Sequence, residues 1–157
     1  LVLNFIPELS KALLEFKRTV KNGGTIAAYV WDYSGKMELM RYFWNAAVRL
    51  FEDAREIDEA ARFEICNPDR LADAFNSAGL KNTEVTFIDV PTIFKDFDDY
   101  WTPFLSGIGP APGYCMSLSE KNRDLLKNEV YKSLPIGKEG SIKLIARAIA
   151  VKAENNK

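Results

Sequence analysis

Apolar residues along the chain recur with two different periods, which predict strands in some segments and helices in others. Residues 1–6, LVLNFI, form a short apolar run without alternation, which is typical of a strand buried on both faces. The next segment, residues 7–20, is predicted to be a helix, because its apolar residues lie three or four positions apart: Leu9, Leu13, Phe16 and Val20. The run TIAAYVW over residues 25–31 predicts a second buried strand. These three elements form a βαβ unit, so we expect parallel strands here.

The middle of the chain predicts a second helix followed by a strand. Apolar residues at helical spacing indicate a helix over residues 37–51, and the charged stretch EDAREIDEAAR either continues that helix or loops away from it. Asn67 followed by Pro68 is typical of a helix N-terminus, and the apolar helical pattern ends at Gly79. The segment TEVTFIDV, residues 83–90, then predicts a strand.

The last third of the chain is aromatic and rich in turn residues before it returns to regular structure. Ser117 with Glu120 matches a capping box, which predicts a helix that continues to about Leu134. Residues 141–153 are apolar on both alternating faces and therefore predict a strand in the interior of a sheet. Because no repeat or linker divides the chain, we expect one α/β domain over residues 1–157.

The composition excludes several kinds of chemistry. The formal net charge of −1 gives no reason to expect a nucleic acid as a partner. Histidine is absent, so Ser-His-Asp and Cys-His catalysis are excluded, and proton transfer would need Asp, Glu, Tyr or Lys. Cys66 and Cys115 fit no paired metal spacing, which indicates buried free thiols in a reducing, cytoplasmic compartment and no metal site. No apolar run is long enough to span a membrane, so no membrane partner is expected.

Two stretches of the sequence are candidates for a ligand-binding site. GIGPAPG, residues 107–113, has no preceding strand and carries prolines where a phosphate loop needs N–H donors, so we interpret it as a shaped loop over a pocket. The tripeptide WDY follows the second strand, where ligands bind in parallel α/β sheets. Its alternative role is structural, with Trp31 and Tyr33 closing the core and Asp32 beginning the next turn.

A third stretch, DFDDYW over residues 96–101, combines carboxylates with aromatic residues at helical spacing. Phe97 and Trp101 are expected to pack in a core. Asp98, Asp99 and Tyr100 either line a pocket or, for the two carboxylates, lie in a first helical turn where the helix dipole favours them.

The stretch LVLNFIPELSKALLEFKRTVKNGGTIAAYVW resembles the fourth strand, the following helix and the fifth strand of class I S-adenosylmethionine-dependent methyltransferases, of the type 11 or ubiquinone-biosynthesis-like kind. NPDRLADAFNSAGLKNTEV resembles the later helix and turn before the sixth strand of that family. The resemblance implies a partial Rossmann-like three-layer sandwich with a mostly parallel sheet. Its antiparallel last strand would lie between the fifth and sixth strands. The segments from about residue 36 to 63 and from about 91 to 134 would be insertions that cover the site.

The same resemblance implies where ligands would bind. The end of the fourth strand, where family members contact S-adenosylmethionine, corresponds to Leu3, Asn4 and Phe5. The substrate side corresponds to the end of the fifth strand and to a cover segment, which together contain Trp31, Tyr33, Tyr100, Trp101 and Tyr114. No catalytic residue is fixed. If the nucleophile must lose a proton, the candidate bases are Asp32, Asp98 and Asp99.

The leading hypothesis is therefore the C-terminal portion of a methyltransferase that acts on a small molecule and is inactive alone, since the family's N-terminal βα units and glycine-rich cofactor turn have no match in this sequence. The first alternative is a non-catalytic half-Rossmann module that associates with itself. A nicotinamide-dependent reductase comes third, because no Tyr-x-x-x-Lys motif is present. In the first two cases, the strand over residues 1–6 is predicted to pair with a second copy or with an N-terminal segment outside this sequence.

Overall fold

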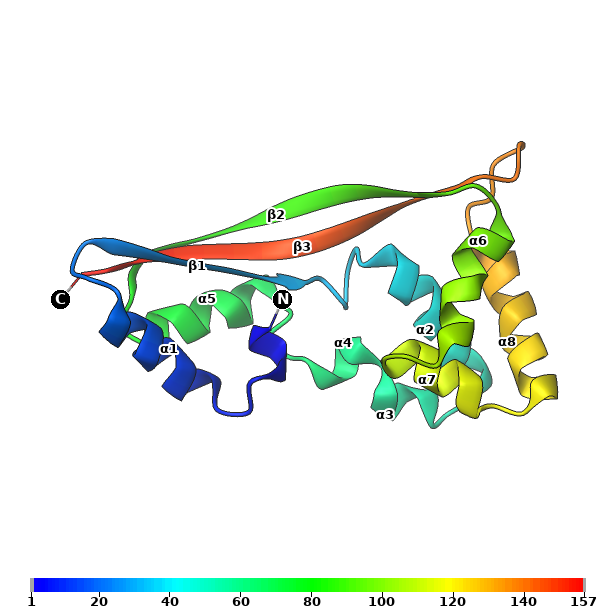
Figure 1. Cartoon of the computed structure of the whole chain (residues 1–157), viewed down its shortest axis with the longest axis horizontal. Coiled ribbons are helices and arrows are strands. Elements are labelled where there is room, and N and C mark those ends of the chain that lie inside the picture. Colours follow the sequence, from blue (N-terminus) through cyan, green and yellow to red (C-terminus); the bar gives the residue numbers. More distant parts are fainter. Residues whose placement is uncertain (1, 157) are drawn as a thin grey trace. The chain divides into compact units, whose positions relative to one another are not determined.

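A computed structural model of the chain describes residues 2–156, and these residues pack into two compact units (Figure 1). Unit 1 contains residues 2–32, 63–89 and 147–156. Unit 2 contains residues 33–62 and 90–146, and it holds nearly all of the two predicted insertion segments. Two strands run from one unit into the other, and the single domain over residues 1–157 stays a prediction.

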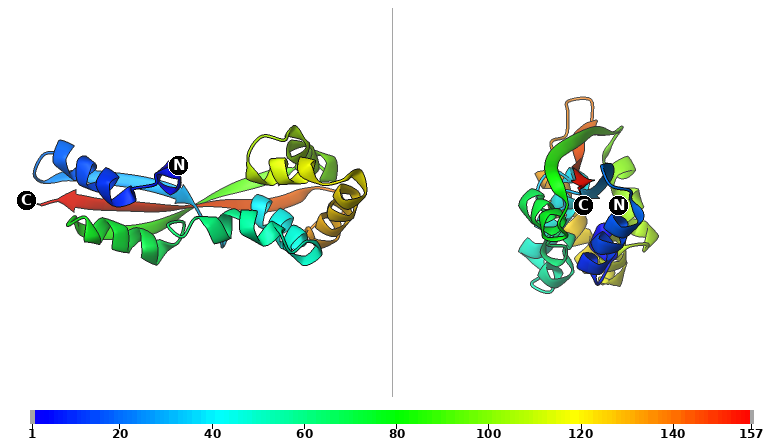
Figure 2. Two further views of the ribbon diagram at one scale, coloured as in Figure 1. Left: turned by 90° about the horizontal axis from the view of Figure 1, so that it is seen from below. Right: turned by 90° about the vertical axis from the view of Figure 1, so that its left-hand side faces the viewer.

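Over residues 2–156 the sheet has three strands, β1 (Gly24–Trp31), β2 (Lys81–Phe94) and β3 (Ile142–Asn155), in the order β1-β3-β2. β1 and β3 are antiparallel, with a register that runs from Gly24 opposite Asn155 to Trp31 opposite Ala148. Figure 2 shows β3 pointing the opposite way to both of its neighbours. The predicted position of the last strand, between the other two, is thereby confirmed.

The predicted mostly parallel Rossmann sheet is wrong. β1 and β2 do run in the same direction, as helix-linked strands of a βαβ unit do, but they are not neighbours. Because β3 lies between them and runs the other way, each hydrogen-bonded pair of strands is antiparallel. The antiparallel direction of β3 agrees with the resemblance. The mostly parallel sheet is wrong because residues 3–5 form no strand, so β1 has no parallel neighbour among residues 2–156.

The strand predicted over residues 1–6 is also wrong. Leu1 lies outside the described residues, and Leu3–Phe5 form a short 3-10 helix, η1, in which the N–H of Phe5 donates to the carbonyl of Val2 at 2.9 Å. A lone apolar segment without a neighbouring strand has no ladder partners for its backbone groups, so local turns satisfy them instead. The side chain of Leu3 is nonetheless buried.

Two helices, α1 (Leu9–Thr19) and α5 (Pro68–Ser77), lie on one face of the sheet in unit 1 (Figures 1 and 2). The predicted cap of α5 is confirmed, because the Asn67 side chain accepts hydrogen bonds from the N–H groups of Asp69 and Arg70. β1 alternates accordingly: Ile26 and Val30 are buried toward the helices, while Tyr29 is 50% exposed on the other face. Within residues 2–156, unit 1 therefore has two layers, and the three-layer sandwich is not formed.

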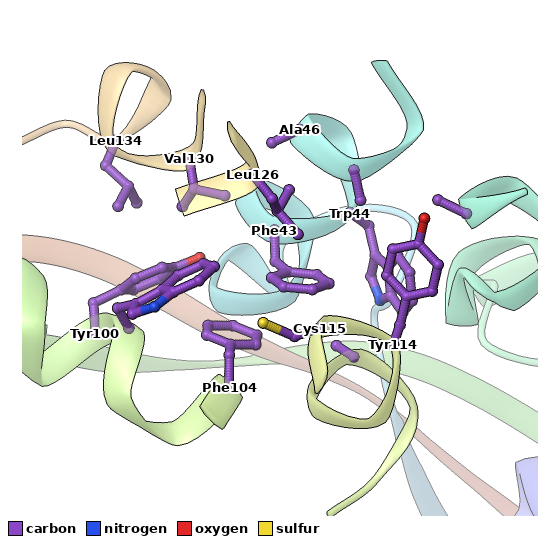
Figure 3. Close-up of a cluster of buried hydrophobic side chains, with 14 of the residues drawn as sticks. Phe43, Trp44, Ala46, Tyr100, Phe104, Tyr114, Cys115, Leu126, Val130 and Leu134 are labelled. Carbon is purple, nitrogen blue, oxygen red and sulfur yellow. The ribbon is translucent and has the colours of Figure 1, made fainter. Parts of the chain in front are cut away.

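Unit 2 is helical around an aromatic core. Its elements are α2 (Glu38–Leu50), α3 (Ala54–Ile57), α4 (Glu59–Arg62), α6 (Phe97–Trp101), η2 (Thr102–Ser106), α7 (Pro110–Ser117) and α8 (Glu120–Ser133). Figure 3 shows Phe43 lying flat against Phe104, with ring centroids 4.5 Å apart, beside Leu126 and Val130 of α8. Each of these four side chains is buried, and they fix α2, η2 and α8 against one another.

The capping box predicted at Ser117 is misplaced by two residues. Ser117 is the last residue of α7, and its hydroxyl donates to the carbonyl of Tyr114. Ser119 caps α8 instead, because its hydroxyl oxygen accepts from the N–H of Asn122. The charged stretch after α2 forms α3 and α4, and the predicted strand over 83–90 extends to Phe94. No helix among residues 2–156 combines the length and apolarity needed to cross a membrane.

Candidate functional site

The candidate site of unit 1 lies at the carboxyl end of β1, where η1 packs beside the strand. η1 supplies the three predicted cofactor-contacting residues, Leu3, Asn4 and Phe5, which differ in burial. Leu3 is buried and anchors η1, Asn4 is half-buried, and Phe5 is 59% exposed. Phe5 lies edge-to-face on Phe63, with ring centroids 5.2 Å apart. Of these three residues, Asn4 and Phe5 can therefore present a polar and an aromatic group to a ligand.

The amide of Asn4 carries an unmet hydrogen-bonding capacity. Its Nδ2 atom is buried and has no hydrogen-bond partner among residues 2–156. Leaving a buried amide donor unpaired costs about 1–3 kcal/mol, so such groups are usually paired. A ligand that offers an acceptor atom at this position would satisfy it.

Trp31 and Asp32 form the end of β1. Trp31 is half-buried opposite Ala148. Asp32 is only 7% exposed, and its backbone N–H donates to the carbonyl of Arg147 at 2.9 Å, which holds the residue to β3. The turn after β1 therefore places a carboxyl group in a shielded position at the end of the strand.

Cys66 is buried in the same unit and interacts electrostatically with Asp32. Burial, and second the negative charge of Asp32, raise the pKa of the Cys66 thiol to about 12. The thiol is therefore protonated at neutral pH and is a poor nucleophile. Both cysteines are buried and free, as the sequence predicted.

Three of the predicted substrate-side residues lie in the core of unit 2, where Tyr100, Trp101 and Tyr114 are all nearly or fully buried. The hydroxyl of Tyr100 donates to the carbonyl of Leu39 at 2.8 Å, and burial raises its pKa. The hydroxyl of Tyr114 donates to Oδ1 of Asp53 at 3.1 Å, and burial followed by this contact raises its pKa. Each hydroxyl is thus already engaged within the protein. Substrate contact by these residues stays a prediction.

The remaining predicted residues of unit 2 are Tyr33, Asp98 and Asp99. Tyr33 is half-buried, and its carbonyl accepts from Nη1 of Arg41 at 3.1 Å. Asp98 and Asp99 are exposed in the first turn of α6, where Oδ2 of Asp99 accepts from the N–H of Lys95. This position agrees with the helix-dipole explanation of the two carboxylates. Neither carboxylate is shielded from water.

Sequence reasoning missed a set of buried polar contacts in unit 2. Arg41 forms two hydrogen bonds with the carboxylate of Asp58, at 2.9 and 2.7 Å, and both side chains are largely buried. The indole N–H of Trp44 donates to Oε2 of Glu59, which is 2% exposed, and burial raises the pKa of that carboxyl group. Asp58 and Glu59 belong to the charged stretch EDAREIDEAAR, which was predicted either to continue the preceding helix or to loop away from it, with no sign of burial.

The segment GIGPAPG does border a pocket, as the sequence predicted, but its last four residues, 110–113, begin α7 and are not a loop. A cavity of about 440 Å³ is lined by residues of α2, η2 and this segment, including Met40, Phe104, Ile108 and Pro112. Gly109 has φ 96° and is the residue before α7, which begins at Pro110. Among residues 2–156, no group of three or more Cys, Asp or Glu side chains is placed to hold a metal ion.

Comparison with known proteins finds likeness in structure but none in sequence. No protein-family model matches the chain, and no curated protein matches it. Among solved structures, the chain is similar to a Bacillus halodurans protein named a "putative methyltransferase", with 13% sequence identity and a TM-score of 0.51. The match covers 99% of this chain and 61% of that protein, so this chain spans less than two thirds of its length. A likeness at this identity supports the fold and assigns no activity.

Proposed function

We propose that this chain is part of an S-adenosylmethionine-dependent methyltransferase that acts on a small molecule. The observation that carries the proposal is the order β1-β3-β2 with its antiparallel middle strand, which is the order that the sequence resemblance implied for the C-terminal strands of that family. The likeness to the Bacillus halodurans protein, over 99% of this chain, supports it independently of the sequence pattern.

The residues present at the end of β1 fit such a cofactor in two respects. The buried Nδ2 of Asn4 offers a hydrogen-bond donor to a hydroxyl, carboxylate or ring nitrogen. The exposed ring of Phe5, held edge-on by Phe63, offers an aromatic face, and such faces attract cations. Leu3 would hold η1 in place without direct polar contact.

The bound cofactor would supply an electrophilic methyl group on a positively charged sulfur. A lone pair of the acceptor would form the bond to this methyl carbon as the carbon–sulfur bond breaks, and the electron pair of that bond would stay on sulfur. A proton leaves the acceptor if it carries one. In unit 1, Asp32 is the shielded carboxylate that would receive this proton, and Trp31 precedes it at the strand end. Asp98 and Asp99 fit this role less well, because water already surrounds them.

Turnover would require a further segment that contributes the rest of the cofactor site. This chain spans 61% of the length of the protein it resembles, and its sequence contains no glycine-rich turn between a strand and a helix. Positioning of the nucleophile and the methyl group at attack distance accounts for much of the catalysis in such transfers. A chain that holds only part of the site would therefore bind weakly and not turn over.

The proposal is tested by calorimetric titration of S-adenosylmethionine and, separately, of NADPH into the full-length gene product that carries this chain. We expect binding of S-adenosylmethionine, and a loss of affinity of at least about 5-fold in Asn4→Leu, because one hydrogen bond to a buried donor contributes about 1 kcal/mol. Heat from NADPH alone would refute the methyltransferase assignment and favour a reductase. Thr25→Val, on an exposed position of β1, is the matched control.

A further inference from the structure

β2 is the outermost strand on one side of the sheet in unit 1. No other strand of residues 2–156 lies beside its outer edge, as Figure 1 shows. Its segment 81–89 is exposed over much of its length, and both Phe87 and Ile88 are 47% exposed. A long edge of this kind, without proline until residue 91, is a template for pairing with another strand.

The side-chain contacts between β2 and β3 fix how the two strands face each other. Asn82 contacts Glu154, Glu84 contacts Lys152, and Asp89 contacts Arg147. Residue numbers rise along β2 as they fall along β3, and all three pairs fit one antiparallel register. Even-numbered residues of β2 therefore lie beside even-numbered residues of β3.

The hydrogen bonds between β3 and β1 determine which backbone N–H and C=O groups of β2 point toward β3 and which point outward. The N–H of Asp32 donates to the carbonyl of Arg147, so the odd-numbered residues of β3 point their backbone groups toward β1. The even-numbered residues of β3 then point toward β2, and they meet the even-numbered residues there. The odd-numbered residues of β2 are left to point outward. Pro91 agrees with this assignment, because a proline is tolerated in an edge strand where its missing N–H would face outward.

The outward-facing residues have a self-complementary charge pattern. Lys81 and Asp89 are placed symmetrically about Val85, four residues to either side. When two copies of this segment run antiparallel with Val85 opposite Val85, each Lys81 lies opposite the Asp89 of the other copy. Thr83 then lies opposite Phe87. The carboxylate of Asp89, which lies 2.6 Å from Nε of Arg147, is partly exposed.

We propose that residues 81–89 of β2 pair with the same segment of a second copy of this chain, through a two-fold axis at Val85. The three-stranded sheets would join into one antiparallel sheet, and the interface would be the same patch on both copies. The opposite edge of the sheet lacks this symmetry, because the outward residues of β1 are Thr25, Ala27, Tyr29 and Trp31, which carry no charges. The charge pattern therefore favours a second copy at β2 over an unrelated strand.

The first experiment is sedimentation velocity of the full chain over a range of concentrations, for the wild type and Lys81→Glu. We expect a concentration-dependent dimer, and a dimer dissociation constant raised about ten-fold or more by Lys81→Glu, because two opposite-charge cross-strand pairs become like-charge pairs. The matched control is Lys21→Glu, which makes the same charge change at an exposed loop position of unit 1. It should dimerise like the wild type. A wild type that stays monomeric at all concentrations overturns the proposal, and so does an equal effect of both variants.

The second experiment tests the register by oxidative cross-linking of Val85→Cys. Two residues on the axis of a hydrogen-bonded antiparallel pair have Cα atoms about 5.5 Å apart, within the range of about 4.4–6.8 Å that a disulfide spans. Both native cysteines are buried and should not compete. Lys81→Cys is the control, because its two copies would lie roughly 27 Å apart along the strands. We expect a disulfide-linked dimer for Val85→Cys alone. Cross-linking of both variants to the same extent, or of neither, overturns this register.

Discussion

Asn155 joins the last strand to the first helix, and its replacement should destabilise unit 1 strongly. The residue is fully buried at the end of β3, and its Nδ2 donates to the carbonyls of Lys17 and Val20 at 2.9 and 2.6 Å. These carbonyls lie at the C-terminal end of α1, where the last carbonyl groups of a helix have no partner within the helix. One side chain therefore satisfies two backbone acceptors and attaches α1 to the sheet.

The magnitude follows from the groups that lose their partner. Asn155→Leu removes two hydrogen bonds of about 1 kcal/mol each and leaves buried carbonyls that cost more, so we expect a loss of roughly 2–4 kcal/mol in the free energy of unfolding. Asn155→Asp keeps the shape but turns a carboxylate toward two carbonyl oxygens, so at pH 7 its loss should be at least as large. Its stability should recover as the pH falls, because the native environment raises the pKa of the introduced carboxyl group and the protonated form can donate.

The measurement is urea unfolding followed by circular dichroism, at pH 7 and pH 5. The control is Asn156→Asp, since Asn156 is exposed and its Nδ2 donates to the carboxylate of Glu154 at 3.1 Å. It should change the free energy of unfolding by less than about 0.5 kcal/mol. An Asn155→Asp protein as stable as the wild type at pH 7, or one whose stability does not rise on acidification, would refute this account of how α1 is held.

Three further predictions concern stability. Burial raises the pKa of Glu59 above its unfolded value, so the native state binds more protons and the contribution of Glu59 to stability increases as the pH falls through its native pKa. Glu59→Gln should remove this pH-dependent contribution, which is measured by comparing urea unfolding of the wild type and the variant at pH 5, 6 and 7. The same pH dependence in both proteins would contradict the prediction. Gly79→Ala should lower the free energy of unfolding by about 1–3 kcal/mol, because φ is +75° and the new Cβ would lie 2.7 Å from Nζ of Lys17, which would be displaced from the carbonyls of Ala78 and Gly79. Gly23→Ala has the same φ and no atom within 4 Å of the new Cβ, so it measures the backbone strain alone. Equal losses in the two variants would mean that the displacement of Lys17 contributes nothing. Phe43→Ala should lower the free energy of unfolding by about 3–5 kcal/mol, since Phe43 is fully buried against Phe104. Tyr131→Ala, at a half-exposed site, should cause a far smaller loss, and thermal unfolding measures both. Similar losses would argue against the core shown in Figure 3.

The elements that the sequence predicted correctly have strong local signals. Asn67 followed by proline fixed the beginning of α5, and the apolar run TIAAYVW fixed β1, because caps and periodicity depend on near neighbours in the chain. The two-sided apolar pattern of the last strand correctly indicated an interior position. The antiparallel direction of β3 was predicted from the family resemblance and not from this pattern, since it depends on how β3 returns between two strands that are far apart in sequence.

The buried polar residues show why the candidate site was predicted only in part. Asp32 was found from its place after a strand, and the structure does bury it there. Asn4 was included through the resemblance, and its unpaired amide became visible only in three dimensions. Asn155, Arg41 and Glu59 gave no signal, because a polar residue that is buried and paired has the same letter as one in water. Their roles depend on partners 15 to 138 positions away.

The two proposals concern different strands, and this separation makes them independently testable. The cofactor residues lie in η1 and at the end of β1, whereas the pairing segment lies in β2, and β3 runs between the two strands. A second copy on the outer edge of β2 would therefore leave Asn4, Phe5 and Asp32 uncovered. Lys81→Glu should weaken the dimer without changing the affinity for S-adenosylmethionine. Asn4→Leu should lower that affinity without changing the dimer dissociation constant. A loss of both properties in either variant would mean that the cofactor site and the edge of β2 depend on each other, which the strand order gives no reason to expect.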